Sequence, residues 1–432
     1  MARTALDPRA TPDAADSEAG LFYGWWIVGG AFVIYFVSGG LFNTATIYFK
    51  ALITEFGWNR GQLSGVFSLG FLIAGVSSPI WGRIADRRGP RSSFLPGVLL
   101  TGLLCIALSR VWNLQSLYVL YGLFTFSFAG ISLIPISVIL SNWFVRKRGR
   151  AIGFAYTGVG FGTLLLTPLV GLLVTGLGWR MAYIVSGLAL LVLLTPVALW
   201  LKNRPEDMGL TPDGLPPTEP PVADAKSHLP VASAGLRLAE AVRTPTFWLV
   251  ALTWLVTMMP LTAVNLHQVP FITDMGLSTE LAAIAAGFVG GMSILGRIGS
   301  GILSEKFPIQ RIYSVCYLLM GLGIASLWAT ASMGPFCLIP YVVFFGIAVG
   351  GCFALTALLV GDLFGVRALG EIFGMLGLAG TTGGALGGTG AGLLFDALGS
   401  YNGVFALCIG LSLVGAVLIL LVHRPLAVEV EG

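Results

Sequence analysis

Long apolar stretches follow one another along almost the whole chain, separated by short polar segments. A helix needs about 20 apolar residues to cross the hydrocarbon region of a membrane, and runs such as 186–201 lack the alternation of a membrane β-strand. Twelve stretches are long enough, at about residues 24–49, 61–84, 92–110, 114–141, 149–175, 179–201, 245–271, 279–303, 310–332, 335–361, 369–394 and 401–423. The pattern predicts an all-α protein with twelve transmembrane helices.

The polar segments divide the chain into two parts. We expect residues 1–20 to form a disordered tail, and residues 202–244, which contain several prolines, to form a flexible linker. The linker separates a six-helix bundle at 21–201 from another at 245–424, and 425–432 remain as a short tail.

The composition agrees with a membrane protein. Hydrophobic residues make up 56% of the chain, charged residues only 10%, and the mean hydropathy is +0.88. Soluble domains are about one quarter charged, so this chain has too few charges to cover a surface that faces water. The same values exclude a disordered chain.

Cations gather in one set of loops. That set holds Arg83, Arg87, Arg88, Arg91, Arg146, Lys147, Arg148, Arg150, Lys306, Arg311, Arg367 and the basic residues of the linker. The opposite loops hold only Lys50, Arg60, Arg110 and Arg180. Positively charged loops stay in the cytoplasm, so we expect a multi-pass protein of the cell membrane with both termini and the linker cytoplasmic. This topology accounts for the net charge of +4 without a nucleic-acid partner.

The two halves resemble each other when the second is shifted by 219 positions. The matching pairs are Gly82 with Gly301, Asp86 with Glu305, Arg87 with Lys306 and Arg148 with Arg367. Several matches in order, on equivalent loops, indicate an internal repeat. We therefore expect two pseudo-symmetric bundles with a ligand site between them near the middle of the membrane.

The loop Gly82-Arg83-Ile84-Ala85-Asp86-Arg87-Arg88-Gly89-Pro90-Arg91 resembles the loop between helices two and three of the major facilitator superfamily. A degenerate copy follows helix eight, with Glu305 and Lys306. The resemblance covers about residues 21–424 and implies a secondary transporter that works by alternating access. It assigns a gating role to Gly82, Arg83, Asp86, Arg87, Gly89, Arg91, Glu305 and Lys306, in which Asp86 pairs across the interface or caps a helix. The alternative is a solvated charge cluster that only sets the topology.

Narrower patterns resemble the monocarboxylate porter and oxalate/formate antiporter branch. They are Asn142 to Ala151, Arg204 to Leu210, Gly296-Arg297, and His267 to Phe271 followed by Asp274 and Gly276. The resemblance implies a small organic anion as substrate, and an arginine of helix eight that holds its carboxylate.

Arg297 is the outstanding candidate for this role on physical grounds. It lies eight residues before Glu305, about 12 Å from the end of the helix at about 1.5 Å per residue. A charge inside the membrane is costly and therefore suggests a function, and a guanidinium suits a carboxylate in bidentate geometry. The equivalent position in the first half is Ser78, so the repeat does not require an arginine. The alternative is an arginine that reaches the membrane surface or pairs with a helix end.

Departures from the branch affect the expected coupling. The animal porters carry an aspartate where this chain has Ser293, and their lysine of helix one maps to Asn43. One cation favours a monocarboxylate over a dicarboxylate. Without a carboxylate in the middle of the membrane, protons travel with the substrate, on His267 or through water to Asp362, or the protein works by exchange or uniport. The residues leave these alternatives open.

Other polar residues on the spans complete the candidate substrate site. They are Tyr35, Asn43, Tyr121, Asn265, Gln268, Ser293 and Thr356. Each is able to donate a hydrogen bond to a carboxylate or hydroxyl group, or to form a structural hydrogen bond between helices worth less than about 1 kcal/mol.

The sequence therefore predicts a secondary active transporter of a small organic anion, a monocarboxylate, that works by proton symport or anion exchange. One alternative is a drug or sugar facilitator in which Arg297 is structural. Another is a non-transporting membrane sensor or an embedded enzyme, although we find no soluble output domain and no converging nucleophile and base. No phosphate-binding loop or metal-ligand motif is present, so we expect no cofactor and no metal, and a protein that functions as a monomer.

Overall fold

The computed structural model describes residues 22–58, 60–214 and 235–425. This part of the chain is helical, and its only strand-like contact is an isolated bridge between Gly235 and Gly365. The expected tails at 1–20 and 425–432 fall outside the described residues, except for residue 425.

The first half contains seven helices. They are α1 (Tyr23–Phe42), α2 (Ala45–Phe56), α3 (Arg60–Arg88), α4 (Arg91–Leu108), α5 (Leu114–Phe128), α6 (Leu133–Trp143) and α7 (Arg148–Trp200). The second half begins with the short α8 (Leu238–Ala241). It continues with α9 (Pro245–Asp274), α10 (Thr279–Leu303), α11 (Ile309–Met333), α12 (Leu338–Phe364), α13 (Leu369–Leu398) and α14 (Asn402–Leu420).

Ten segments of the described chain are long and apolar enough to cross a membrane. One of them, α7, has 53 residues and reverses direction at Gly178 (φ 82°, ψ 157°), so it supplies two crossings. Helix α13 is as long as a crossing but is rich in glycine and threonine. Counted in this way, the helices account for twelve crossings, and the all-α membrane fold that the sequence predicts is confirmed.

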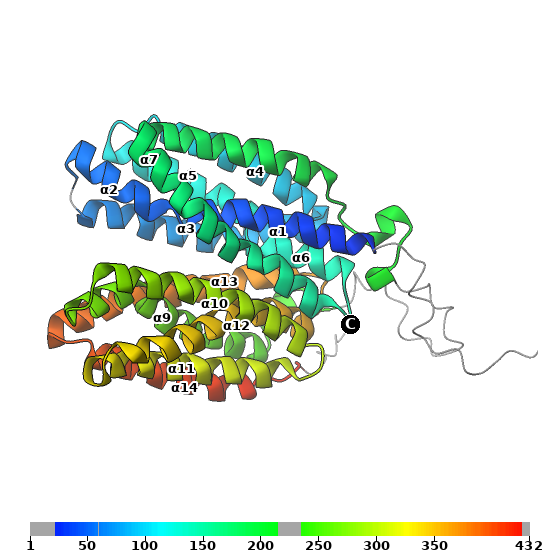
Figure 1. Cartoon of the computed structure of the whole chain (residues 1–432). Coiled ribbons are helices and arrows are strands. Elements are labelled where there is room, and N and C mark those ends of the chain that lie inside the picture. The colour runs from blue at the N-terminus through cyan, green and yellow to red at the C-terminus, as the bar shows by residue number, and fades with distance from the viewer. Residues whose placement is uncertain (1–21, 59, 215–234, 426–432) are drawn as a thin grey trace, which may run out of the picture.

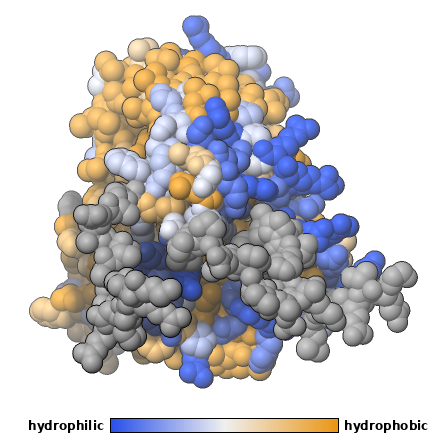
Figure 2. All heavy atoms as spheres, turned by 90° about the vertical axis from the view of Figure 1, so that its right-hand side faces the viewer, coloured by the Kyte–Doolittle hydropathy of each residue, from blue (hydrophilic) through white to orange (hydrophobic). Residues whose placement is uncertain are grey.

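The two halves lie side by side as separate layers of helices, α1 to α7 in one and α9 to α14 in the other (Figure 1). Two helix pairs make the most extensive contacts between the halves: α3 packs on α13, and α7 packs on α10. The loops 89–90, 144–147, 304–308 and 365–368 contain or adjoin most of the cations of the helical part, and all lie at the end where α1 begins, which we call the basic end. Figure 2 views the molecule from this end and shows hydrophilic side chains gathered between apolar flanks.

Two predicted crossings are interrupted helices. The first breaks between α1 and α2 at Asn43 and Thr44, and the fourth breaks between α5 and α6 around a short 3-10 turn at Ala129–Ile131. Backbone carbonyls freed inside a membrane need donors, and side chains supply them. Trp81 Nε1 donates to the oxygen of Phe126 at 2.7 Å, and Ser93 Oγ donates to that of Gly130 at 3.0 Å. Sequence periodicity does not reveal the second break because these donors come from other helices, whereas at the first break Asn43 and Thr44 donate to the oxygens of Gly39 and Leu41.

At the opposite end, α2 is joined to the turn of α7 by a charged contact outside the spans. The Glu55 carboxylate accepts hydrogen bonds from Trp179 Nε1 and Arg180 Nη1. Both bonds stabilise the ionised carboxylate and lower the pKa of Glu55, the bond from Trp179 most strongly, although partial burial opposes them. The Arg180 guanidinium also lies 4.2 Å from the centre of the Trp179 ring. The contact therefore fixes the outer end of the first crossing.

The polar segment between the halves has structure at both of its described ends. A turn at Pro205–Met208 and another at Pro212–Gly214 follow α7, and α8 precedes α9. Leu236 N donates to the oxygen of Phe364 at 2.9 Å, next to the bridge between Gly235 and Gly365. The sequence predicts a flexible linker over 202–244, and these ends are instead folded onto the basic end. Residues 215–234 lie outside the described part.

Candidate functional site

Arg297 lies where α10 faces the first half. Its side chain is 7% exposed, and its Nη1 donates to Ser293 Oγ one turn earlier at 2.6 Å. Its Nε is buried and has no hydrogen-bond partner, and no carboxylate of the described residues forms an ion pair with it. A buried guanidinium that lacks a counter-charge has unused capacity to bind an anion.

Two tyrosines of the first half face this guanidinium. Tyr35 on α1 and Tyr156 on α7 both lie near Arg297, and their rings meet edge to face with centres 5.5 Å apart. Tyr156 is fully buried, and its hydroxyl contacts Ser137 Oγ at 2.5 Å. A Cβ on Gly160 would lie 3.6 Å from Nη1, so α7 approaches the arginine closely. Helices α1, α7 and α10 thus enclose one cation together with hydroxyl groups.

The structure does not bring the other candidate substrate residues to Arg297. Asn43 ends α1 and donates to Thr163 Oγ1 at 2.8 Å. Gln268 accepts from the Tyr341 hydroxyl at 2.6 Å and also contacts the exposed Asn265. These contacts match the structural alternative, in which polar groups join neighbouring helices.

Tyr121 and Thr356 lie in the interior of their own halves. Tyr121 packs edge to face on Phe67, with ring centres 5.2 Å apart. Thr356 is 2% exposed and bonds the Tyr313 hydroxyl at 2.8 Å. Neither has a described contact with the guanidinium of Arg297.

The two candidate coupling residues are also separate from Arg297. The His267 ring bonds the Tyr401 hydroxyl at 3.2 Å and the oxygen of Gly388 at 3.3 Å. Asp362 lies near the basic end, where its carboxylate pairs with Arg424 at 2.5 Å. The described residues hold no group of three or more histidine, cysteine or acidic side chains that is suited to a metal ion.

At the basic end, Asp86 joins the halves by capping a helix of the other half. Its two carboxylate oxygens accept from the amides of Gly370 at 2.9 Å and Glu371 at 2.8 Å, in the first turn of α13. The first amides of a helix have no partner within the helix and favour a negative charge. Arg83 adds an ion pair with Glu371 at 3.7 Å.

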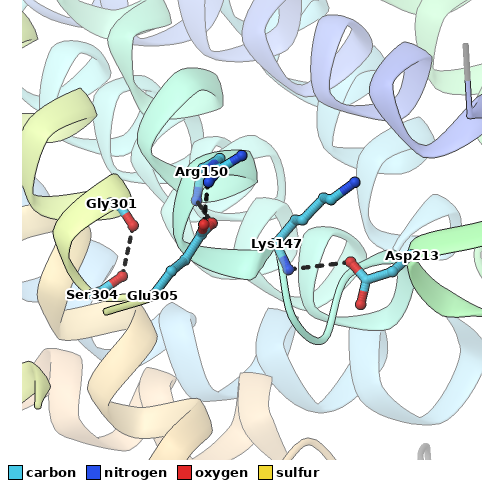
Figure 3. A network of polar contacts seen from close by, with 6 residues as sticks. All are labelled: Lys147, Arg150, Asp213, Gly301, Ser304 and Glu305. Carbon is cyan, nitrogen blue, oxygen red and sulfur yellow. Dashed lines mark hydrogen bonds and ion pairs between the residues drawn. The ribbon is translucent and has the colours of Figure 1, made fainter. Parts of the chain in front are cut away.

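Glu305 makes the equivalent contact in the opposite direction. It accepts from the amide of Arg150, in the first turn of α7, at 3.0 Å, and it pairs with Arg150 Nε at 2.7 Å (Figure 3). The repeat aligns Asp86 with Glu305, and each caps the helix that begins in the other half. Together these contacts join the two halves at the basic end.

Glycines allow the backbones to meet beside both contacts. A Cβ on Gly82 would lie 2.0 Å from the oxygen of Gly370, and one on Gly149 would lie 2.2 Å from the oxygen of Gly301. No side chain fits at such distances. The glycine of the loop motif is therefore explained by the crossing of α3 and α13.

The remaining candidate gating residues have other surroundings. Gly89 has φ +86°, and the Arg91 amide donates to Asn203 Oδ1 at 2.9 Å, so the linker supports this turn. Arg87 and Lys306 are exposed and have no described ion pair. Their surroundings agree with a role in topology.

Several residues of the site carried no signal in the sequence. Tyr156 is one of many aromatic residues in an apolar run, and its role depends on which helices meet. Arg150 lies inside the Asn142 to Ala151 pattern, but the pattern does not show that its partner is Glu305, and Glu371 belongs to no motif. Each is the third residue of its helix, so a search for charged residues at helix starts would have found both.

The fold and this site define a two-lobed helical membrane carrier. A model of the Major Facilitator Superfamily matches residues 31–345 and 301–431. The chain belongs to this superfamily of membrane transporters.

Curated relatives specify the similarity further. Monocarboxylate transporter 13 of Bos taurus is 27% identical over 407 residues, which cover 93% of this chain and 90% of the relative. Human monocarboxylate transporter 11 is 27% identical over 437 residues (98% and 87%), and human monocarboxylate transporter 12 is 24% identical over 400 residues (89% and 78%). These similarities agree with the branch that the sequence motifs predict.

A solved structure supports the fold alone. The proton:xylose symporter XylE, bound to 6-bromo-6-deoxy-D-glucose, superimposes with a TM-score of 0.72 at 12% sequence identity. The match covers 93% of this chain and 96% of the symporter chain.

Proposed function

We propose that this protein carries a small organic anion, a monocarboxylate, across the membrane by alternating access. The observation that supports the substrate class is Arg297, a buried guanidinium with an unpartnered Nε and no described counter-charge. A carboxylate docked there would gain charge-assisted hydrogen bonds that water does not match in a buried site. The relatives named monocarboxylate transporters support the same substrate class.

In this proposal the substrate carboxylate binds between the halves, with Tyr35 as a further donor. The Tyr35 ring is half-buried beside Tyr156, on the side of Arg297 that belongs to the first half. A ligand held by α1 and α10 together contacts both halves. It is therefore able to favour a rearrangement of one half against the other, because its contacts differ between the two states.

We place the basic end in the cytoplasm, because its loops carry most of the cations. The contacts of Asp86 and Glu305 then correspond to a state closed toward the cytoplasm. Opening that side requires these helix caps to separate, and closing the opposite side completes the cycle.

The coupling is proton symport or anion exchange. Arg297 has no acidic neighbour in the described chain that would carry a proton, and the candidates His267 and Asp362 lie elsewhere. In proteoliposomes, a proton gradient drives uptake in the first case, and an internal anion drives it in the second.

The test is uptake of labelled lactate, pyruvate, formate and a sugar into proteoliposomes, with Arg297→Ala, Arg297→Lys and the control Arg311→Ala. Arg311 is an exposed arginine of α11. We expect both Arg297 variants to lose about 10- to 100-fold in kcat/KM for an acid, since lysine lacks the planar fork. The control should keep full activity.

Binding gives an independent measurement. A saturating acid should raise the melting temperature of the purified protein and fail to do so in Arg297→Ala. Unchanged uptake of every acid in Arg297→Ala, or uptake of the sugar by both proteins, would support the facilitator alternative in which Arg297 is structural.

A further inference from the structure

The turn at Pro212–Gly214 contributes a carboxylate to the loop before α7. Asp213 accepts hydrogen bonds from three consecutive backbone amides: Val145 at 2.9 Å, Arg146 at 2.7 Å and Lys147 at 3.2 Å. Figure 3 shows the carboxylate of Asp213 pointing at the amide of Lys147. Successive amides directed at one point form a concave anion site, and here the chain fills that site with its own side chain.

The backbone at Asp213 is adapted to this contact. Asp213 has φ +60° and is the one non-glycine residue with positive φ in the part of the chain that the structure describes. This conformation is unfavourable for residues with a Cβ, although aspartate tolerates it better than most. Three hydrogen bonds to a carboxylate offset the cost. The turn therefore directs its acid into the loop at the expense of local backbone energy.

The loop that Asp213 holds leads directly into the closed gate. Only Arg148 and Gly149 separate Lys147 from Arg150, whose amide and side chain bind Glu305 of the other half. Arg148 also reaches across: a Cβ on Gly361 would lie 2.7 Å from its Nη1, and the carboxylates of Asp362 and Asp213 both lie near its charge. The direction of the first turn of α7 thus controls two contacts between the halves.

We propose that Asp213 is a positioning residue of the gate. By fixing amides 145–147, it orients the start of α7 so that Arg150 meets Glu305, and it thereby favours the state closed at the basic end. The proposal explains why the segment between the halves folds back onto the first half instead of only connecting the two. It holds for any substrate, because it concerns the equilibrium between the two states.

The test measures the distance across the basic end in the purified full-length protein. Spin labels at Arg88→Cys and Arg311→Cys, on a background without native cysteines, report on the two halves from exposed positions. Asp213→Ala should raise the ratio of open to closed molecules roughly tenfold, since charge-assisted hydrogen bonds are lost. Asp213→Asn keeps one acceptor oxygen and tolerates positive φ, so it should give a smaller shift in the same direction.

The matched control is Asp207→Asn. Asp207 is also an acid of this segment, but it accepts from the amide of Arg204 within its own turn. This variant should leave the distance distribution unchanged. If Asp213→Ala does not fold, Asp213→Asn decides.

A variant of Asp213 that melts at a lower temperature but keeps the wild-type distances would overturn the proposal, because Asp213 would then only cap a surface loop. An equal shift in Asp207→Asn would do the same. Neither measurement requires a substrate. The test of Asp213 therefore remains valid even if Arg297 does not bind an anion.

Discussion

Ser293 is the direct hydrogen-bond partner of the Arg297 guanidinium. Its hydroxyl accepts from the guanidinium at 2.6 Å and donates to the oxygen of Gly290 at 2.6 Å. A neutral partner leaves the full positive charge available to a ligand. The resemblance to animal monocarboxylate porters places an aspartate at this position, which would supply a proton acceptor next to the cation.

Ser293→Asp should therefore make transport strongly dependent on pH. An ionised aspartate would compete with the substrate for Arg297 and suppress uptake at about pH 8. Arg297 favours the ionised form, but burial of this position favours the protonated form, so uptake should recover only toward about pH 5. Uptake of a labelled acid is measured across this range. Ser293→Asn has a similar size without a charge and should show the weaker pH dependence of the wild type. Equal profiles for the two variants would contradict the assignment of Arg297 as the anion anchor.

Arg297 could be singled out from the sequence because of its charge, whereas the residues around it could not. A guanidinium in an apolar run is conspicuous in the sequence, whereas Tyr156 resembles any core aromatic residue until α7 is known to meet α10. Gln268 and Thr356 show the reverse case. Their polarity suggested a ligand, and the structure shows that they bond Tyr341 and Tyr313. The partner of a buried polar group is set by tertiary packing, which the sequence does not show.

At the scale of helices, the glycines where α7 crosses α10 control how closely the halves approach. A Cβ on Gly301 would lie 2.3 Å from the oxygen of Gly149, so an alanine requires the two helices to separate. Overpacking of this kind costs about 1–3 kcal/mol. The cost falls on the closed arrangement, where the helices touch.

Gly301→Ala should shift the protein toward the state open at the basic end, by about tenfold in the ratio of states. The matched control is Gly287→Ala, on the same helix, where a Cβ would meet nothing within 4 Å. Replacing glycine by alanine raises helix propensity by a similar amount at both positions. A difference between the two variants therefore reports the contact between Gly301 and Gly149. Spin-label distances between α3 and α11 measure the shift. Identical distributions in the two variants would show that the crossing tolerates a methyl group.

The existence of each helix was predictable from hydropathy, but the breaks were not. The interruptions at Asn43 and at Ala129–Ile131 fall inside continuous apolar runs. At the second break, Trp81 and Ser93 supply donors from other helices, which a local pattern does not contain. At the first break, Asn43 and Thr44 themselves donate to the oxygens of Gly39 and Leu41, one turn earlier.

For the whole molecule, the repeat was the most informative feature of the sequence. Aligning Asp86 with Glu305 anticipated that the two acids have equivalent roles, and the structure shows each capping a helix of the other half. The contact of Asp213 with the loop before α7 has no counterpart in that alignment. It depends on how the segment after α7 folds back, which composition alone described as a flexible linker.

The proposed orientation predicts which positions face the outside of the cell. Trp112→Cys, at the opposite end and 69% exposed in the structure, should react with a membrane-impermeant maleimide in intact cells. Arg311→Cys should react only after the cells are permeabilised, because the basic loops face the cytoplasm. The background lacks the native cysteines. The reverse labelling pattern would place the basic end outside.

The reversal of α7 at Gly178 has a mechanical consequence. A single residue with φ 82° joins its two arms, and no loop lies between them. Most helical hairpins contain spare residues that absorb small displacements, whereas this joint has none. When the arm that carries Tyr156 moves, either the backbone dihedral angles of Gly178 change or the other arm moves with it. We therefore expect the fifth and sixth crossings to move together.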